Sequence, residues 1–138
     1  AVLCHDYAMI DLCAAALKRK NLPFEVRKRS GDFKPGNDTI KVMTMKVSKG
    51  LEFPVVALHG VGQMPLPDED ESEQARIFYV AATRATHRLV IGASGDGAFG
   101  QRLAFGNLGR VKHLGAEIFG GGEFVLMNAD EQRIGVSA

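Results

Sequence analysis

The chain has 138 residues, of which 46% are hydrophobic and 24% charged, and its formal net charge is +1. These values are ordinary for one globular domain with its own core, and they give no overall field that favours or opposes a nucleic-acid partner. The sequence contains no apolar run of membrane-spanning length and no signal peptide, so we expect a cytoplasmic protein without a membrane partner.

Cysteine and histidine usage argues against a disulfide scaffold and against a metal centre. Cys4 and Cys13 are too few for a small secreted scaffold and lack metal-site spacing, so we expect two small buried side chains in a reducing compartment. The four histidines are scattered, and no metal site is predicted. The chain begins on an apolar run without methionine, which is typical of a piece of a longer protein.

The first forty residues predict a strand, a helix and a second short strand. Residues 1–4 are apolar and suit a buried strand, and Asp6 can cap a helix that continues to about Lys20. Asn21 and Pro23 end that helix, and residues 24–26 suit a short strand. One apolar stripe follows the helix at Ile10, Cys13, Ala14 and Leu17.

The middle of the sequence continues the alternation. Strands are predicted at residues 40–45 and from Pro54 to Leu58, joined by a turn in which Gly50 supplies backbone freedom. After a long acidic loop, Ser72 is expected to cap a helix over residues 73–84, and a strand follows at 88–91. The residues of this helix expected to face inward are Ile77, Val80 and Ala81.

Alternating strands and helices predict an α/β fold with an open, mainly parallel sheet and helices on both faces. Ligands of such sheets bind beyond the carboxyl ends of the strands, and we expect two polar clusters, residues 48–53 and 83–85, to converge on one edge. Arg84 could bind a phosphate there or make an ordinary surface ion pair. Glu52 could accept a hydrogen bond from a ribose hydroxyl or pair with Lys49.

The C-terminal part is rich in glycine, with eleven of the sixteen glycines from Gly92 onward. We expect a division into residues 1–94 and a C-terminal extension, 95–138. In the extension, a helix at 99–108, a hairpin of 117–119 with 123–127 and a strand at 133–136 are predicted; a loosely ordered tail is the alternative. The sequence has no GxxxxGK[ST] pattern, and the GxGxxG at residues 95–100 is interpreted as a chance match.

Two long segments carry a family resemblance. Residues 43–54, MTMKVSKGLEFP, closely resemble motif V of the superfamily-one helicases related to UvrD, Rep and PcrA, and residues 73–85, EQARIFYVAATRA, resemble their motif VI. Residues 1–24 are similar to the segment that precedes motif V, so the resemblance covers about residues 1–94. It implies the second RecA-like motor domain, which lacks a P-loop of its own.

The resemblance also implies roles for single residues. Arg84 corresponds to the motif VI arginine that reaches the γ-phosphate of ATP, and Glu52, with Gly50 beside it, to the motif V residues at the nucleotide and its sugar. Thr44 and Lys46 correspond to residues that face single-stranded DNA, although a histidine is common at the second position. Arg76 and Tyr79 match the pattern and are interpreted as structural or cleft-supporting.

The function implied is the C-terminal motor domain of an ATP-dependent DNA helicase or translocase that takes part in DNA repair. The full-length protein is expected to use ATP and Mg²⁺, held between this domain and an N-terminal RecA-like domain of the same polypeptide. Without Walker A and B, this segment alone is predicted to bind neither and to be inactive. Two alternatives remain open: the motor half of a helicase–nuclease complex, and a non-catalytic interaction module that kept the fold.

Overall fold

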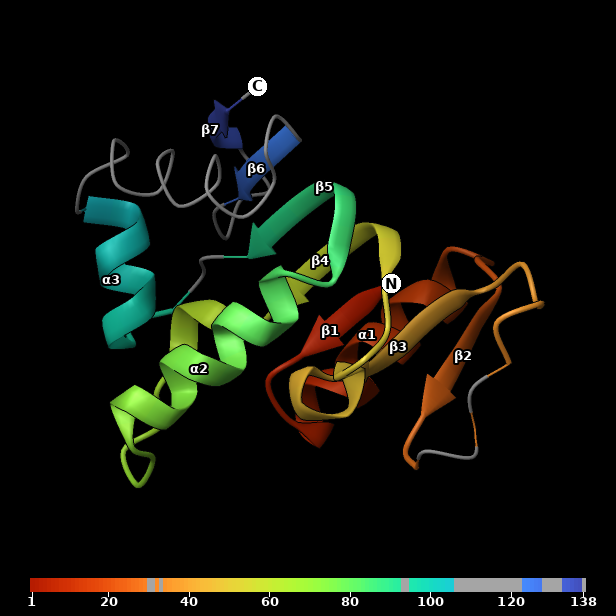
Figure 1. Cartoon of the computed structure of the whole chain (residues 1–138), viewed down its shortest axis with the longest axis horizontal. Helices are drawn as coiled ribbons and strands as arrows, with labels where there is room; N and C mark the ends of the chain where they lie inside the picture. The colour runs from red at the N-terminus through yellow and green to blue at the C-terminus, as the bar shows by residue number, and fades with distance from the viewer. Residues whose placement is uncertain (30–31, 33, 93–94, 106–122, 128–132, 138) are drawn as a thin grey trace.

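The computed structural model describes residues 1–29, 32, 34–92, 95–105, 123–127 and 133–137, and Figure 1 shows how their helices and strands are arranged. One sheet contains seven strands: β1 (Val2–Cys4), β2 (Phe24–Arg27), β3 (Ile40–Thr44), β4 (Phe53–His59), β5 (Ala85–Gly92), β6 (Glu123–Met127) and β7 (Arg133–Ser137). The helices are α1 (Tyr7–Arg19), α2 (Glu71–Ala82) and α3 (Ala98–Phe105), with short 3₁₀ helices η2 (Met45–Ser48) and η3 (Val61–Gln63). None of the described helices is long and apolar enough to cross a membrane.

The strands lie in the order β2-β3-β1-β4-β5-β6-β7, and only β7 is antiparallel to its neighbour. The short β1 lies between β3 and β4, where Leu3 pairs with Met43 on one side and Leu58 on the other. All three side chains are fully buried, as expected for strands covered on both faces. The predicted open, mainly parallel sheet is therefore confirmed.

Helices lie on both faces of this sheet. Successive strand residues point to opposite sides, so neighbouring residues of one strand pack against different helices. Leu3 and Met43 belong to the core cluster beneath α2, whereas Cys4 and Val42 pack with Ile10 of α1. In Figure 1, α2 lies in front of the sheet and α1 behind it. The prediction of helices on both faces is confirmed.

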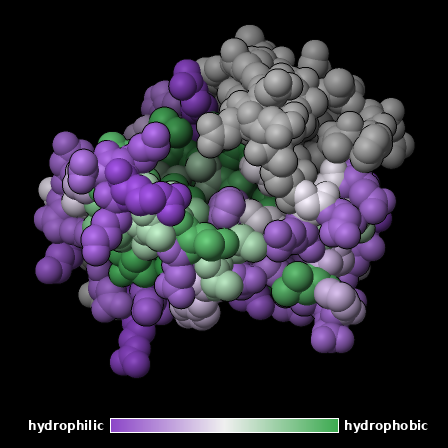
Figure 2. Space-filling view, turned by 180° about the vertical axis from the view of Figure 1, so that it is seen from behind, coloured by the Kyte–Doolittle hydropathy of each residue, from purple (hydrophilic) through white to green (hydrophobic). Residues whose placement is uncertain are grey.

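The face seen from behind is only partly covered by the described helices. The cluster beneath α1 draws its strand residues from β1, β2 and β3 alone, and Val55 of β4 is 46% exposed. Hydrophobic surface gathers toward the middle of this view, surrounded by hydrophilic residues (Figure 2). Among the described residues, α1 thus protects only the β1–β3 part of its face.

The first helix follows its sequence prediction closely, and the second begins earlier than predicted. Asp6 caps α1 by accepting a hydrogen bond from the Met9 N–H at 2.8 Å. The cap of α2 is Asp70, whose Oδ1 accepts from the Glu73 N–H at 2.8 Å, so the prediction of Ser72 was wrong. Several residues of this acidic loop are good caps, and the path of the chain decides which one is used.

The inward-facing residues predicted for α2 are partly confirmed. Ala81 is fully buried and Ile77 packs against the core, whereas Val80 lines a surface groove. Gln74 is also buried, and its Oε1 has no hydrogen-bond partner among the described residues.

The predicted strands after residue 122 are present, and they join the main sheet. β6 pairs in parallel with β5, and β7 pairs antiparallel with β6. The predicted partner of β6 in a hairpin, residues 117–119, lies outside the described residues. The division of the chain at residue 94 stays a prediction.

The glycines of the GxGxxG segment allow a close approach of two backbones. A Cβ on Gly97 or Gly100 would lie 2.5 Å from the backbone of Gln63 or Gly62 respectively. Gly97 N–H donates to the Gly62 carbonyl at 3.0 Å. These glycines therefore bring α3 against η3, which gives them a packing role.

Candidate functional site

Arg84, directly after α2, is bonded to the segment that precedes β4. Its carbonyl accepts a hydrogen bond from the Phe53 N–H at 2.8 Å, and its Nη1 donates to the Leu51 carbonyl at 3.2 Å. Phe53 and Ala85 are also register partners at the start of β4 and β5. The structure thus brings the two sequence-predicted clusters together, with Glu52 between the two residues that contact Arg84.

The clusters meet at the amino ends of the strands, which corrects the expectation that they converge at the carboxyl ends. Gly50 and Glu52 immediately precede β4, and Arg84 immediately precedes β5. In a parallel sheet each crossover returns the chain to the amino edge before the next strand begins. Residues just before two neighbouring strands must therefore share that edge.

The guanidinium of Arg84 is held by three hydrogen bonds to the protein. Besides the bond to Leu51, Nε donates to the Val80 carbonyl at 2.9 Å and Nη2 donates to Thr83 Oγ1 at 3.1 Å. A guanidinium has five N–H donors, so one remains on each terminal nitrogen. The side chain is oriented by the protein and still has a donor pair for an anion.

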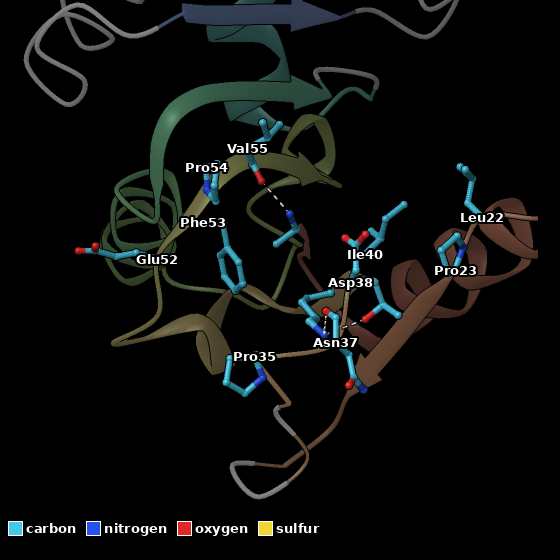
Figure 3. Close-up of a pocket in the computed structure, with 13 residues that line it drawn as sticks. Leu22, Pro23, Pro35, Asn37, Asp38, Ile40, Glu52, Phe53, Pro54 and Val55 are labelled. Carbon is cyan, nitrogen blue, oxygen red and sulfur yellow. Dashed lines mark hydrogen bonds between the residues drawn. The ribbon is translucent and has the colours of Figure 1, made fainter.

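Glu52 lies at the rim of a groove on the same edge of the sheet. The groove has a volume of about 630 Å³, and its walls include Phe53, Val55, Ile40 and Asn37. Figure 3 shows Phe53 directed into the groove and the Glu52 carboxylate directed away from it. Glu52 is exposed and has no hydrogen-bond or ion-pair partner among the described residues, so its carboxylate is available to a ligand outside the groove.

The opposite wall of this groove is organised by Lys41, which the sequence did not single out. Its Nζ lies 2.8 Å from Glu25 Oε2 and 2.7 Å from Thr39 Oγ1, and it also donates to the carbonyls of Lys34 and Asn37. Hydrogen bonds from Lys41 and then Asn37 hold the pKa of the Glu25 carboxyl below its usual value. A nearly buried cation therefore fixes the connection between β2 and β3.

Gly50 is the turn that delivers Glu52 to the amino edge. It has a φ of 80°, and no atom lies within 4 Å of the Cβ that another residue would carry there. The backbone conformation, and not the available space, thus requires glycine at this position, since a left-handed φ is strained for a residue with a side chain. The preceding turn is closed by the buried Ser48, whose Oγ donates to the Met45 carbonyl at 2.6 Å.

Thr44 and Lys46 lie at the opposite edge from Arg84. Thr44 is the last residue of β3, pairs with Cys4 at the carboxyl end of β1, and is 7% exposed. Lys46 follows in η2, the short helix that crosses from this edge toward Gly50, and it is exposed. The predicted nucleotide residues and the predicted DNA residues are therefore separate in space but joined by η2.

Lys46 shares a groove of about 280 Å³ with two other cations, Lys49 and Arg76. We call these three residues the η2–α2 cation cluster. None of the three has an ion-pair partner in the part of the chain that the structure describes. The helical wall of the groove is a single stripe at i, i+3, i+4 and i+7, formed by Glu73, Arg76, Ile77 and Val80.

The grouping of Lys49 and Arg76 with Lys46 was not predicted from the sequence. The helical spacing of Arg76 and Val80 was visible in the sequence, but the packing of η2 against that stripe was not. No group of three or more histidine, cysteine, aspartate or glutamate residues that could hold a metal ion occurs among the described residues.

Comparison with known proteins identifies the family. The UvrD-like helicase C-terminal domain model matches residues 25–95, just over half of the chain. The chain is 43% identical over 67 residues to the ATP-dependent DNA helicase PcrA of Leuconostoc citreum, covering 44% of this chain and 9% of that protein. It is also 43% identical over 58 residues to the ATP-dependent DNA helicase Rep of Escherichia coli K12, covering 38% and 9%.

The Bacillus subtilis PcrA helicase is 38% identical over 63 residues, covering 41% of this chain and 8% of that protein. The matched stretch is thus less than a tenth of each of these relatives. No solved structure matches the chain. The family model matches more than half of the chain, and the mainly parallel sheet has helices on both faces. This chain therefore belongs to the UvrD-like helicase C-terminal domain family, which has a RecA-like α/β fold.

Proposed function

We propose that this chain is the C-terminal motor segment of an ATP-dependent DNA helicase or translocase. The observation that carries the proposal is the pair of hydrogen bonds between Arg84 and the Leu51–Phe53 segment, from Phe53 N–H at 2.8 Å and to the Leu51 carbonyl at 3.2 Å. These bonds place Arg84, which has two remaining N–H donors, on the same sheet edge as the exposed carboxylate of Glu52. A phosphate and a ribose hydroxyl are the groups that such a pair suits.

On the nucleotide side, Arg84 supplies positive charge to the γ-phosphate, and Glu52 accepts a hydrogen bond from the sugar. ATP and Mg²⁺ bind in the complete motor between this segment and an N-terminal RecA-like domain, where Mg²⁺ neutralises phosphate charge. Because Arg84 is tied at Nε to Val80 and at Nη1 to Leu51, its remaining donors are held in place before the nucleotide arrives.

On the DNA side, the η2–α2 cation cluster takes backbone phosphates of single-stranded DNA, and Thr44 contacts the same strand. Three cations that line one groove, without ion-pair partners among the described residues, suit a polyanion, and they would bind its phosphates whatever the base sequence. The stripe that carries Arg76 continues to Val80, whose carbonyl accepts from Arg84 Nε at 2.9 Å. One helix, α2, therefore connects the Arg84 contact to the DNA groove.

The experiment replaces the matching stretch of the Leuconostoc citreum PcrA helicase with residues 25–95 of this chain. We expect the graft to keep DNA-stimulated ATP hydrolysis, and Arg84→Ala to lower that rate by about 10³-fold. Arg29→Ala, an exposed arginine in the same graft, is the control and should leave the rate unchanged. An active graft that tolerates Arg84→Ala contradicts the proposal.

A second measurement keeps the test decisive if the graft does not fold. The isolated 138-residue chain should bind labelled single-stranded DNA in a salt-dependent manner, and it should not hydrolyse ATP. Measurable hydrolysis by the isolated chain, removed by Arg84→Ala, contradicts the assignment of an incomplete site.

A further inference from the structure

The two cysteines form a sulfur pair that the function above does not use. Cys4 Sγ lies 3.8 Å from Cys13 Sγ and donates its hydrogen bond to it, across the contact between β1 and α1. Both thiols are free. The chain has no other cysteine, so each sulfur has the other as its nearest reaction partner.

The two thiols differ in exposure and in acidity. Cys4 is completely buried, whereas Cys13 is partly exposed on α1. The hydrogen bond from Cys4 lowers the pKa of the Cys13 thiol, although burial opposes this effect. The hydrogen bond to Cys13, burial and the nearby Asp6 carboxylate all raise the pKa of the Cys4 thiol. Since the thiolate is the nucleophile, Cys13 is the thiol that reacts first.

We propose that Cys4 and Cys13 are a redox-active dithiol in which Cys13 reacts with peroxides and Cys4 then closes a disulfide between β1 and α1. This role is independent of the proposed motor function. The contact of the two sulfurs, with one reachable from solvent and the other held behind it, carries the proposal. The sequence spacing predicted only two small buried side chains in a reducing compartment.

The chemistry balances in two steps with hydrogen peroxide as oxidant. The Cys13 thiolate attacks one peroxide oxygen, an S–O bond forms, the O–O bond breaks, and the leaving hydroxide takes a proton to become water. Cys4 sulfur then attacks the Cys13 sulfenic sulfur, an S–S bond forms, the S–O bond breaks, and the Cys4 proton leaves with the second hydroxide as water. Two thiols are oxidised and one peroxide is reduced to two waters.

The experiment treats the folded chain with a small excess of hydrogen peroxide, alkylates it, and follows tryptic peptide 1–18. That peptide holds both cysteines, because the first lysine or arginine in the sequence is Lys18. We expect it to become lighter by two hydrogen atoms and to resist alkylation until dithiothreitol is added. Oxygen gained at Met9 in the same peptide is scored separately.

Single variants separate the two roles. In Cys4→Ser, oxidation of Cys13 should stop at a sulfenic acid that dimedone traps. In Cys13→Ser, Cys4 should react with hydrogen peroxide about tenfold more slowly than Cys13 does in Cys4→Ser. The difference should vanish in urea, where the chain is unfolded. If Cys4→Ser does not fold, partial alkylation of the unmodified folded chain makes the same comparison, and Cys13 must be labelled first.

Two results overturn the proposal. One is a folded chain whose peptide 1–18 remains fully alkylatable after peroxide treatment. The other is a Cys4 that reacts as fast as Cys13, whether in the folded variants or in partial alkylation of the folded chain.

Discussion

Arg84 Nη1 donates a hydrogen bond to the carbonyl oxygen of Leu51 at 3.2 Å, and so joins two segments that lie 33 residues apart in the sequence. The Phe53 N–H returns a bond to the Arg84 carbonyl at 2.8 Å. Glu52 lies between these two contacts, so its backbone cannot shift without moving Arg84. The candidate phosphate and sugar contacts are therefore one mechanical unit.

Arg84→Lys is expected to remove the function of this unit while keeping its charge. Lysine is a point charge and cannot reproduce a planar fork that bonds Val80, Leu51 and Thr83 at once. In the PcrA graft, ATP hydrolysis should fall by about 10²-fold or more, measured as phosphate release with saturating DNA. Near-normal ATP hydrolysis by Arg84→Lys would mean that the positive charge alone suffices and that the three hydrogen bonds of the guanidinium are not needed.

The helix cap of α2 gives a matched pair of variants that separates the observed cap from the predicted one. Asp70→Ala should lower the free energy of unfolding by about 1 kcal/mol, because the Glu73 N–H loses its acceptor at 2.8 Å. Ser72→Ala, inside the first turn and exposed, should change it by less than about 0.5 kcal/mol. Urea unfolding followed by circular dichroism measures both, and the reverse order of effects would restore Ser72 as the cap.

The strands were predictable because their signal is local, and their partners were not. Apolar runs at residues 1–4, 54–58 and 88–91 each produced a strand at about the predicted place. The strand at Glu123–Met127 was also predicted, but its pairing with β5 depends on a contact far away in sequence that no local pattern specifies. Local preference decides which element forms, and long-range packing decides where it lies.

The site was predictable in its residues but not in its geometry. The meeting of the Glu52 and Arg84 segments was expected, but the predicted edge was wrong, because these segments do not lie beyond the carboxyl ends of the strands, where ligands of parallel sheets commonly bind. Both segments precede a strand, which was sufficient to place them at the amino edge. The hydrogen bonds of Lys41 were not predicted, because three of its four acceptors come from the irregular connection between β2 and β3, which has no regular sequence pattern.

Each member of the η2–α2 cation cluster should contribute to DNA affinity through charge. Lys46→Ala, Lys49→Ala and Arg76→Ala should each reduce the slope of log affinity against log salt by about 0.7 for single-stranded DNA. Fluorescence anisotropy of a labelled oligonucleotide over a salt series measures the slope. Lys20→Ala, an exposed cation at the end of α1, is the control and should leave the slope unchanged.

Lys41→Met should destabilise the chain by about 2–3 kcal/mol, because four acceptors share the three N–H donors of this nearly buried ammonium and would lose them. The cost is moderated because the Glu25 side chain keeps 28% exposure and can be hydrated. Lys18→Met, on the exposed end of α1, is the control. Urea midpoints measure the difference, and equal midpoints for the two variants would show that the hydrogen bonds of Lys41 contribute nothing to stability.

The pH dependence of stability should carry a contribution from His59 at the end of β4. Burial lowers the pKa of the His59 imidazole from its usual value of 6.5, and the Asp6 carboxylate only partly opposes this effect. Between the lowered folded pKa and 6.5, the unfolded chain binds more protons, so stability falls as pH decreases through that window.

Below the folded pKa the loss is complete, and above the unfolded pKa it is absent. His59→Gln removes the ionisation, so its urea midpoint should change less than that of the unmodified chain between about pH 7.5 and about pH 5. His87→Gln, a replacement of an exposed histidine, is the matched control. A steeper fall in His59→Gln than in the unmodified chain would reverse the sign and rule out burial of His59 as the cause.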